Sequence, residues 1–173
     1  MSDRTILVAG IGNIFLGDDG FGVEVAQRLA GRSLPNGVRV VDYGIRGFDL
    51  AYALLDGPDA TILIDAMPRG EAPGTIFVLE PDLEAVSWGT DEPGHPQGSF
   101  QGHAMTPDSV FALVRTLGGT PRNILVVGCE PETFGPEEEG QLGLSATVAA
   151  VVPEAITTVE RLLAQVTAAG SVA

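Results

Sequence analysis

Residues 5–22 read TILVAGIGNIFLGDDGFG and mark the change from a buried strand to a helix. The first five, Thr5 to Ala9, form a continuous apolar run, which is typical of a strand covered on both faces of a parallel sheet. A loop rich in glycine and aspartate follows. Phe21, Val25 and Leu29 then recur at i, i+4 and i+8, and this spacing predicts a helix with one buried face. A strand, a loop and a helix in this order predict an α/β fold.

The same alternation continues along the chain and predicts a single domain with a five-stranded sheet. Further strands are predicted at residues 38–41, 60–65, 75–79 and 123–127, and further helices at residues 47–55, 107–117 and 145–167. In the first of these helices, Phe48, Tyr52 and Leu55 are expected to face inward. We expect the domain to occupy residues 1–173, with an ordered core at about residues 5–167.

The connection between the third and fourth predicted strands bears on the topology. It runs from Asp65 to Thr75 and is too short for a crossover helix. It also contains residues that break helices, namely Pro68, Gly70, Pro73 and Gly74. Because parallel neighbours need a long crossover, we expect these two strands to pair antiparallel in a mostly parallel sheet.

Composition excludes several classes of function. The chain has 173 residues, a formal net charge of −14, one cysteine and no lysine. The phosphate backbone of a nucleic acid would be repelled, so we exclude DNA and RNA as partners. Without lysine there is no Gly-Lys-Ser/Thr phosphate loop and no Schiff-base chemistry. The single cysteine, Cys129, cannot form an internal disulfide, and we expect it to be a small buried side chain.

The sequence also bears on where the protein works. No apolar run approaches the ~18 residues that a membrane span needs. The first ten residues lead directly into a strand, without the basic start and cleavage site of a secretory signal. We therefore expect a cytoplasmic protein without a membrane partner, and a monomer.

Three residues that could bind one metal ion are predicted at the same edge of the sheet. Asp19 follows the first strand, Asp65 closes the third, and His103 precedes the helix at 107–117. In open α/β sheets, ligands bind outside the carboxyl ends of the strands, so we expect these side chains to meet. Two carboxylates and an imidazole form an open-sided ligand set for a metal such as nickel or zinc.

Each of these residues also has a structural interpretation. Asp18 or Asp19 could cap the first helix, and Asp65 could hold a turn at the end of its strand. A single histidine such as His103 is more often structural than a ligand, and His95 is an alternative ligand. Spacing alone leaves these interpretations open.

A nucleotide-binding or small-molecule-binding α/β domain is an alternative on the residues alone. Gly10-Ile11-Gly12 after a strand resembles the start of a dinucleotide-binding loop. However, Phe15 stands where the third glycine of that fingerprint belongs, and several residues separate the glycine pair from the helix. The indication is therefore weak.

Seven motifs, in their order along the chain, resemble those of the nickel–iron hydrogenase maturation proteases. They are Gly10 to Gly22, Asp42-Tyr43-Gly44-Ile45-Arg46-Gly47, Ile64-Asp65-Ala66, Pro73-Gly74-Thr75, His103 with Pro107-Asp108, Val127-Gly128-Cys129-Glu130-Pro131, and Gly143-Leu144-Ser145. The resemblance extends from about Thr5 to Leu163. It implies a three-layer α/β/α sandwich and an endopeptidase. The family's reaction is removal of a short carboxy-terminal extension from the hydrogenase large-subunit precursor after nickel insertion.

The resemblance also implies roles for particular residues. The family's metal-binding positions correspond to Asp19, Asp65 and His103, which we take as metal ligands and catalytic residues. In the turn after the second strand, substrate contacts are expected from Asp42, Gly44, Arg46 and Gly47.

Nickel would arrive already bound to the precursor, which is the expected partner. Either the metal polarises the carbonyl group or the water, or one aspartate acts as general base. The alternative from another class is a non-catalytic metal-sensing chaperone of the large subunit.

Overall fold

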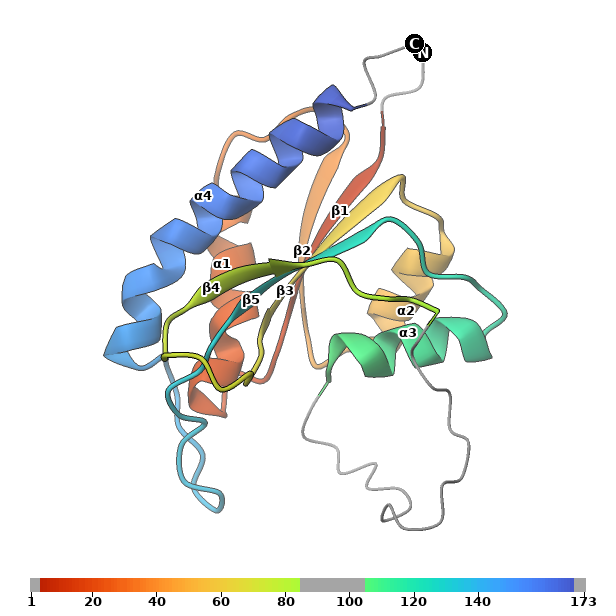
Figure 1. Ribbon diagram of the computed structural model, residues 1–173. Helices are drawn as coiled ribbons and strands as arrows, with labels where there is room; N and C mark the ends of the chain where they lie inside the picture. The colour runs from red at the N-terminus through yellow and green to blue at the C-terminus, as the bar shows by residue number, and fades with distance from the viewer. Residues whose placement is uncertain (1–3, 85–104, 170–173) are drawn as a thin grey trace.

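A five-stranded sheet forms the centre of the computed structural model, which describes residues 4–84 and 105–169. The strands are β1 (Ile6–Ile11), β2 (Val38–Gly44), β3 (Ala60–Ala66), β4 (Ile76–Leu79) and β5 (Ile124–Cys129). Their order across the sheet is β2-β1-β3-β5-β4, with β4 antiparallel to the rest (Figure 1). The α/β class and the mostly parallel sheet with one antiparallel strand are thus confirmed.

The partner that we expected for β4 is wrong. β4 pairs with β5, from Ile76 opposite Cys129 to Leu79 opposite Val126, and does not pair with β3. The chain leaving β3 is held to the end of β5 instead, because Met67 N–H donates to the Cys129 carbonyl at 2.9 Å. The connection therefore crosses the end of β5 before it turns back. This leaves room for β5 between β3 and β4.

Helices cover both faces of the sheet and confirm the α/β/α sandwich (Figure 1). One face carries α1 (Phe21–Ala30) and α4 (Ala146–Ala168), and the other carries α2 (Gly47–Leu55) and α3 (Pro107–Thr116). Among the described residues, no helix has both the length and the apolar character needed to cross a bilayer.

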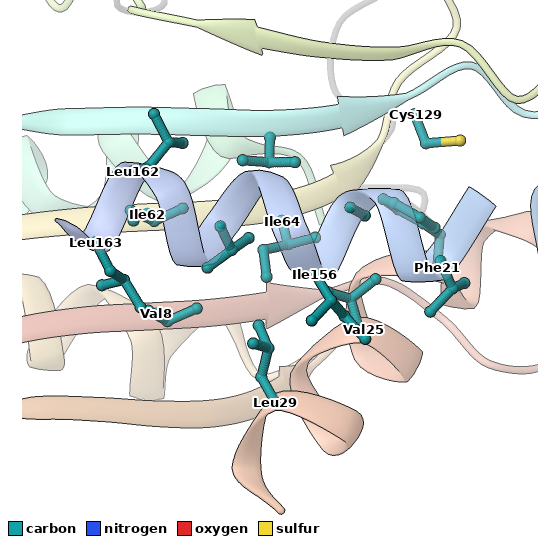
Figure 2. Close-up of a cluster of buried hydrophobic side chains, with 14 of the residues drawn as sticks. Val8, Phe21, Val25, Leu29, Ile62, Ile64, Cys129, Ile156, Leu162 and Leu163 are labelled. Carbon is teal, nitrogen blue, oxygen red and sulfur yellow. The ribbon is translucent and has the colours of Figure 1, made fainter. Parts of the chain in front are cut away.

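The larger of two buried clusters lies between the sheet and the α1/α4 layer (Figure 2). Alternate residues of the parallel strands point into it, since side chains two apart on a strand share a face. Its fully buried members include Val8, Ile62, Ile64, Val25 and Leu29. Complete burial of each such side chain stabilises the fold by about 1.5–3 kcal/mol, which holds the strands in the register that the site requires.

The expected orientation of α2 is wrong for two of its aromatic residues. Phe48 and Tyr52 are 61% and 56% exposed, whereas Leu50 and Ala51 are fully buried. The helix reads GFDLAYALL and is apolar on almost every side, so spacing alone could not select its buried face. The small side chain of Ala51 faces inward, and the two aromatic rings remain on the surface.

Candidate functional site

Asp19 lies in a short 3-10 helix, η1 (Gly17–Gly20), which leads directly into α1. The sequence predicted a loop here. The Asp19 carboxylate is half-buried, and its Oδ2 accepts a hydrogen bond from Asn13 N–H at 2.8 Å. Burial raises the pKa of Asp19, and the hydrogen bond from Asn13 acts in the opposite direction. The Asp19 carboxylate is thus held in place by a hydrogen bond, and it binds a proton more tightly than an exposed aspartate does.

Glycines bring η1 and α1 directly onto the carboxyl ends of β1 and β3. A Cβ atom at Gly22 would lie 2.1 Å from the Ile64 carbonyl oxygen, and one at Gly12 would lie 1.8 Å from the Asp19 carbonyl oxygen. A Cβ at Gly10 would likewise lie 2.2 Å from the carbonyl oxygen of Gly22. The glycines at positions 10 and 12 therefore accommodate the chain's own backbone, not a phosphate. This arrangement removes the main argument for a nucleotide-binding domain.

Asp65 is the second-last residue of β3 and is only 3% exposed. Its pKa is raised well above its usual range, first by burial and then by the negative charge of Asp19, while a hydrogen bond from the Ala66 backbone opposes this shift. The effect of Asp19 on this pKa means that the two carboxylates lie close together. Within the described part of the chain, Asp65 Oδ1 has no hydrogen-bond partner. Leaving such an acceptor unsatisfied costs about 1–3 kcal/mol, which a bound cation would offset.

The third expected ligand, His103, lies outside the described residues, as does His95. Its position relative to the two carboxylates therefore stays a prediction. Across residues 4–84 and 105–169, no three His, Cys, Asp or Glu side chains are grouped as a metal would require. Asp19 and Asp65 form a carboxylate pair, and Oδ1 of Asp65 has no hydrogen-bond partner among the residues that the structure describes.

Asp18 has a structural role that the sequence did not reveal. It is fully buried and accepts hydrogen bonds from the N–H groups of Glu132, Thr133 and Ser145 at 2.7–3.0 Å, and from the Ser145 hydroxyl at 2.9 Å. It therefore ties η1 to both ends of the β5–α4 loop and does not cap α1. Ser145 Oγ in turn accepts from Val148 N–H and caps α4.

The end of β5 carries two further buried groups. The Glu130 carboxylate accepts hydrogen bonds from the N–H groups of Arg69 and Gly70, at 2.7 and 3.3 Å, and so holds the β3–β4 loop. Cys129 is fully buried, as expected, and burial raises the pKa of its thiol to about 12. Such a thiol stays protonated near neutral pH and is a poor nucleophile.

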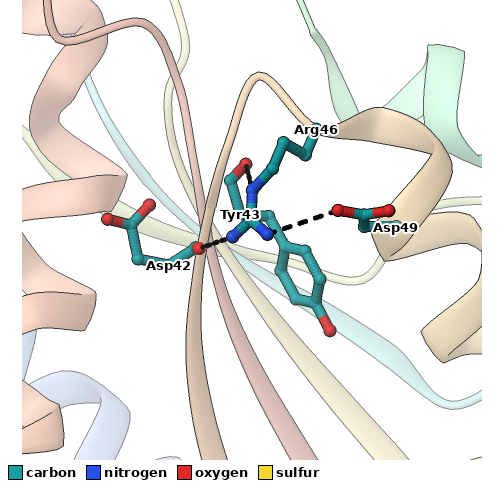
Figure 3. A network of polar contacts seen from close by, with 4 residues as sticks. All are labelled: Asp42, Tyr43, Arg46 and Asp49. Carbon is teal, nitrogen blue, oxygen red and sulfur yellow. Dashed lines mark hydrogen bonds and ion pairs between the residues drawn. The ribbon is translucent and has the colours of Figure 1, made fainter.

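The turn after β2 is held together by Arg46 (Figure 3). The guanidinium donates to the carbonyls of Asp42 and Tyr43, at 2.5 and 3.3 Å, and pairs with Asp49 at 3.2 Å. It also lies 5.7 Å from the centroid of the Tyr43 ring. Burial raises the pKa of Tyr43, and the positive charges of Arg39 and Arg46 oppose this. Arg46 therefore has internal partners for several of its donors.

The other residues predicted to contact substrate shape the same turn. Gly44 has a φ of +55°, and its carbonyl accepts from Gly12 N–H at 3.0 Å, which joins the ends of β2 and β1. The Asp42 carboxylate accepts from Gln27 at 3.0 Å, and Gly47 begins α2. These contacts define the shape of the turn, and substrate binding by its residues stays a prediction.

Comparison with known proteins identifies the family. The sequence profile of the hydrogenase maturation proteases matches residues 23–162. The chain belongs to the hydrogenase maturation protease family. The hydrogenase 2 maturation protease of Escherichia coli K12 is 31% identical over 167 residues, which are 95% of this chain and 92% of that protein. The structure of the hydrogenase maturating endopeptidase HybD from E. coli is similar, with a TM-score of 0.71, 27% identity, and 94% and 93% of the two chains covered.

Several other relatives of this protein have longer chains. The hydrogenase expression/formation protein HupM of Azotobacter chroococcum mcd 1 is 36% identical over 138 residues, covering 78% of this chain and 62% of that protein. For HoxM of Azotobacter vinelandii and HupD of Rhodobacter capsulatus, the matching region is 60% and 65% of their length. The chain thus spans less than two thirds of these three relatives.

Exposed apolar side chains lie on loops at the same edge of the sheet as the carboxylate pair. Six large ones lie on the loops and first helical turn at the carboxyl edge of the sheet, and we call them the apolar rim: Ile14, Phe15, Ile45, Phe48, Phe134 and Leu142. Backbone hydrogen bonds join these loops, including one from Gln141 N–H to the Phe15 carbonyl at 2.8 Å. Exposed apolar surface next to a polar site is typical of a surface that binds another protein.

Proposed function

We propose that the protein is an endopeptidase that removes the carboxy-terminal extension of a nickel–iron hydrogenase large-subunit precursor after nickel insertion. The observation that carries the proposal is the carboxylate pair of Asp19 and buried Asp65, whose Oδ1 lacks a partner among the described residues. Family membership supports the reaction, and the apolar rim supports a protein substrate. The protein would act in the cytoplasm as a monomer.

In this proposal, nickel is cargo of the substrate. Asp19, Asp65 and His103 recognise the ion that the precursor carries, and nickel accepts both carboxylate and imidazole ligands. The unsatisfied Oδ1 of Asp65 fits this role, because a cation would supply the interaction that the described residues do not. Recognition of the ion would bring the adjacent peptide bond to the carboxylates only when the precursor is loaded.

Hydrolysis also requires a group that takes a proton from the attacking water. Asp19 is the half-buried member of the pair, whereas Asp65 is 3% exposed, so water reaches Asp19 more readily. We assign the general-base role to Asp19, with the turn formed by Asp42, Gly44, Arg46 and Gly47 contributing to the binding of the precursor.

The test compares nickel-loaded and nickel-free precursor by mass spectrometry after incubation with the protein. Wild type should shorten only the loaded precursor, and Asp19→Asn, Asp65→Asn and His103→Ala should each abolish the cut. Asp56→Asn is the matched control, because Asp56 is exposed at the far end of α2. Binding of loaded precursor without any change in its mass would favour the chaperone alternative, and trimming by all three variants would exclude the site.

A further inference from the structure

Three residues lie in a row across the sheet beside the carboxylate pair. Asp65 of β3 is in register with Gly128 of β5, which is in register with Phe77 of β4. All three lie on the α2/α3 face, since Leu63 and Val126, two residues before Asp65 and Gly128, belong to the cluster on that face. Strands are about 4.8 Å apart, so the backbone at Phe77 lies about 10 Å from that at Asp65.

The glycine in the middle of this row lets the aromatic ring lie toward Asp65. A Cβ atom at Gly128 would be 2.2 Å from Cε2 of Phe77 and 2.6 Å from its Cζ. The ring therefore occupies the space above β5 where any other residue would place its side chain. It forms a flat apolar shelf at the carboxyl edge, on the side of the pair away from β1.

Arg69 is positioned on this shelf. Its guanidinium carbon lies over the Phe77 ring, 4.9 Å from the ring centroid, which is a cation–π contact. Its backbone is fixed as well, because its N–H donates to the buried Glu130 carboxylate at 2.7 Å. Among the described residues the guanidinium donates no hydrogen bond and forms no ion pair, so its N–H donors are available to a ligand.

The charge of Arg69 is not compensated within the described part of the chain. The ion pairs formed there involve Arg28, Arg32 and Arg46, and the Arg69 guanidinium has the Phe77 ring as its contact. The residue is exposed in a protein with a net charge of −14. Asp19 and Asp65 would repel a negatively charged group of a ligand, whereas Arg69 would attract it. The arginine therefore favours one position for such a group beside the carboxylate pair.

We infer that Arg69 binds a carboxylate of the precursor and thereby sets where the chain lies across the carboxylate pair. This inference rests on the proposed function. A guanidinium offers parallel N–H donors that match a carboxylate. Arg69 is then a residue that determines specificity and takes no part in bond breaking.

The test measures kcat and KM for nickel-loaded precursor with Arg69→Gln, Arg69→Lys and the control Arg122→Gln. Arg122 is also an exposed arginine, but it precedes β5 at the opposite edge of the sheet. We expect Arg69→Gln to raise KM about tenfold with kcat nearly unchanged, as for loss of one charge-assisted contact. The KM of Arg69→Lys should lie between those of wild type and Arg69→Gln, because lysine keeps the positive charge but lacks the parallel N–H donors of a guanidinium.

Changes in the precursor identify the group that Arg69 binds. In one series, each Asp or Glu of the extension is replaced by Asn or Gln, and in another the terminal carboxylate is converted to an amide by peptide ligation. One of these changes should raise the KM of the wild-type protein by as much as Arg69→Gln raises it for the unchanged precursor. The same change should not raise the KM of Arg69→Gln any further. Equal KM values for Arg69→Gln and Arg122→Gln would overturn the inference and leave the proposed function intact. A wild-type protein that does not cut loaded precursor would overturn both.

Discussion

Replacing Asp65 by asparagine should make the metal-free protein more stable while it abolishes the reaction. The carboxylate is 3% exposed, lies close to the negative charge of Asp19, and has an oxygen without a partner among the described residues. Asparagine has nearly the same shape, carries no charge, and can donate a hydrogen bond toward Asp19. We expect the free energy of unfolding to rise by about 1–3 kcal/mol at about pH 8, the usual cost of an unsatisfied buried polar group.

The pH dependence of this gain follows from the pKa of Asp65. Its pKa is about 4 in an unfolded chain and well above that in the folded protein. The folded protein therefore keeps a proton that the unfolded chain releases. Wild type should lose stability as the pH rises from about 4 through the folded-state pKa, and Asp65→Asn should lose less, because only the smaller effect of Asp19 remains. The advantage of the variant should thus be small in acid and grow with pH.

Urea unfolding between about pH 4 and pH 9, with a chelator present, measures this difference. For a chain of this size, the expected gain corresponds to about 2–12 °C in melting temperature at the alkaline end. Asp56→Asn is again the control, since its exposed carboxylate should give a small difference that changes little with pH. A variant that is less stable than wild type at about pH 8, or a gain equal at all pH values, would refute the reasoning.

Three further predictions concern the surroundings of the pair. Gly22→Ala should lower the free energy of unfolding by about 2–4 kcal/mol in urea, because its Cβ would lie 2.1 Å from the Ile64 carbonyl oxygen. Asp18→Ala should cost about 3–5 kcal/mol in the same assay, since it leaves buried N–H donors unpaired. Phe15→Ser should weaken binding of loaded precursor about tenfold by calorimetry without lowering stability, whereas Leu117→Ser, exposed at the end of α3, should leave binding unchanged.

The elements of the fold could be predicted because each has a strong local pattern. Continuous apolar runs of the β1 and β3 kind occur in covered parallel strands, and Ser145 at the start of an apolar helix is a typical cap. The partner of β4 could not be predicted in this way. It depends on the contact between Met67 and Cys129, which are far apart in the sequence, and no local pattern encodes such a contact.

The candidate site was predictable in part for a similar reason. Asp19 and Asp65 follow strands whose carboxyl ends meet at one edge, so topology alone brings them together. The different roles of Asp18 and Asp19 could not be read from the sequence, because they depend on which carboxylate faces the β5–α4 loop. Arg69 was not predicted either. Its position depends on the space above Gly128 and on the Glu130 carboxylate, which become visible only in three dimensions.

The anchoring of the β5–α4 loop has a consequence for how such proteins diversify. Asp18 binds both ends of the loop, through Thr133 and Ser145. The turn from Pro136 to Gly140 is closed by its own backbone hydrogen bond at 2.8 Å. The acidic tip at residues 137–139 lies between the two anchored ends of the loop and outside the contacts that Asp18 makes. Mutations could accumulate at the tip and retune partner choice while the reaction centre stays unaltered. Replacing the tip by that of another family member, with both ends of the loop unchanged, would be a practical way to direct the protein toward another precursor.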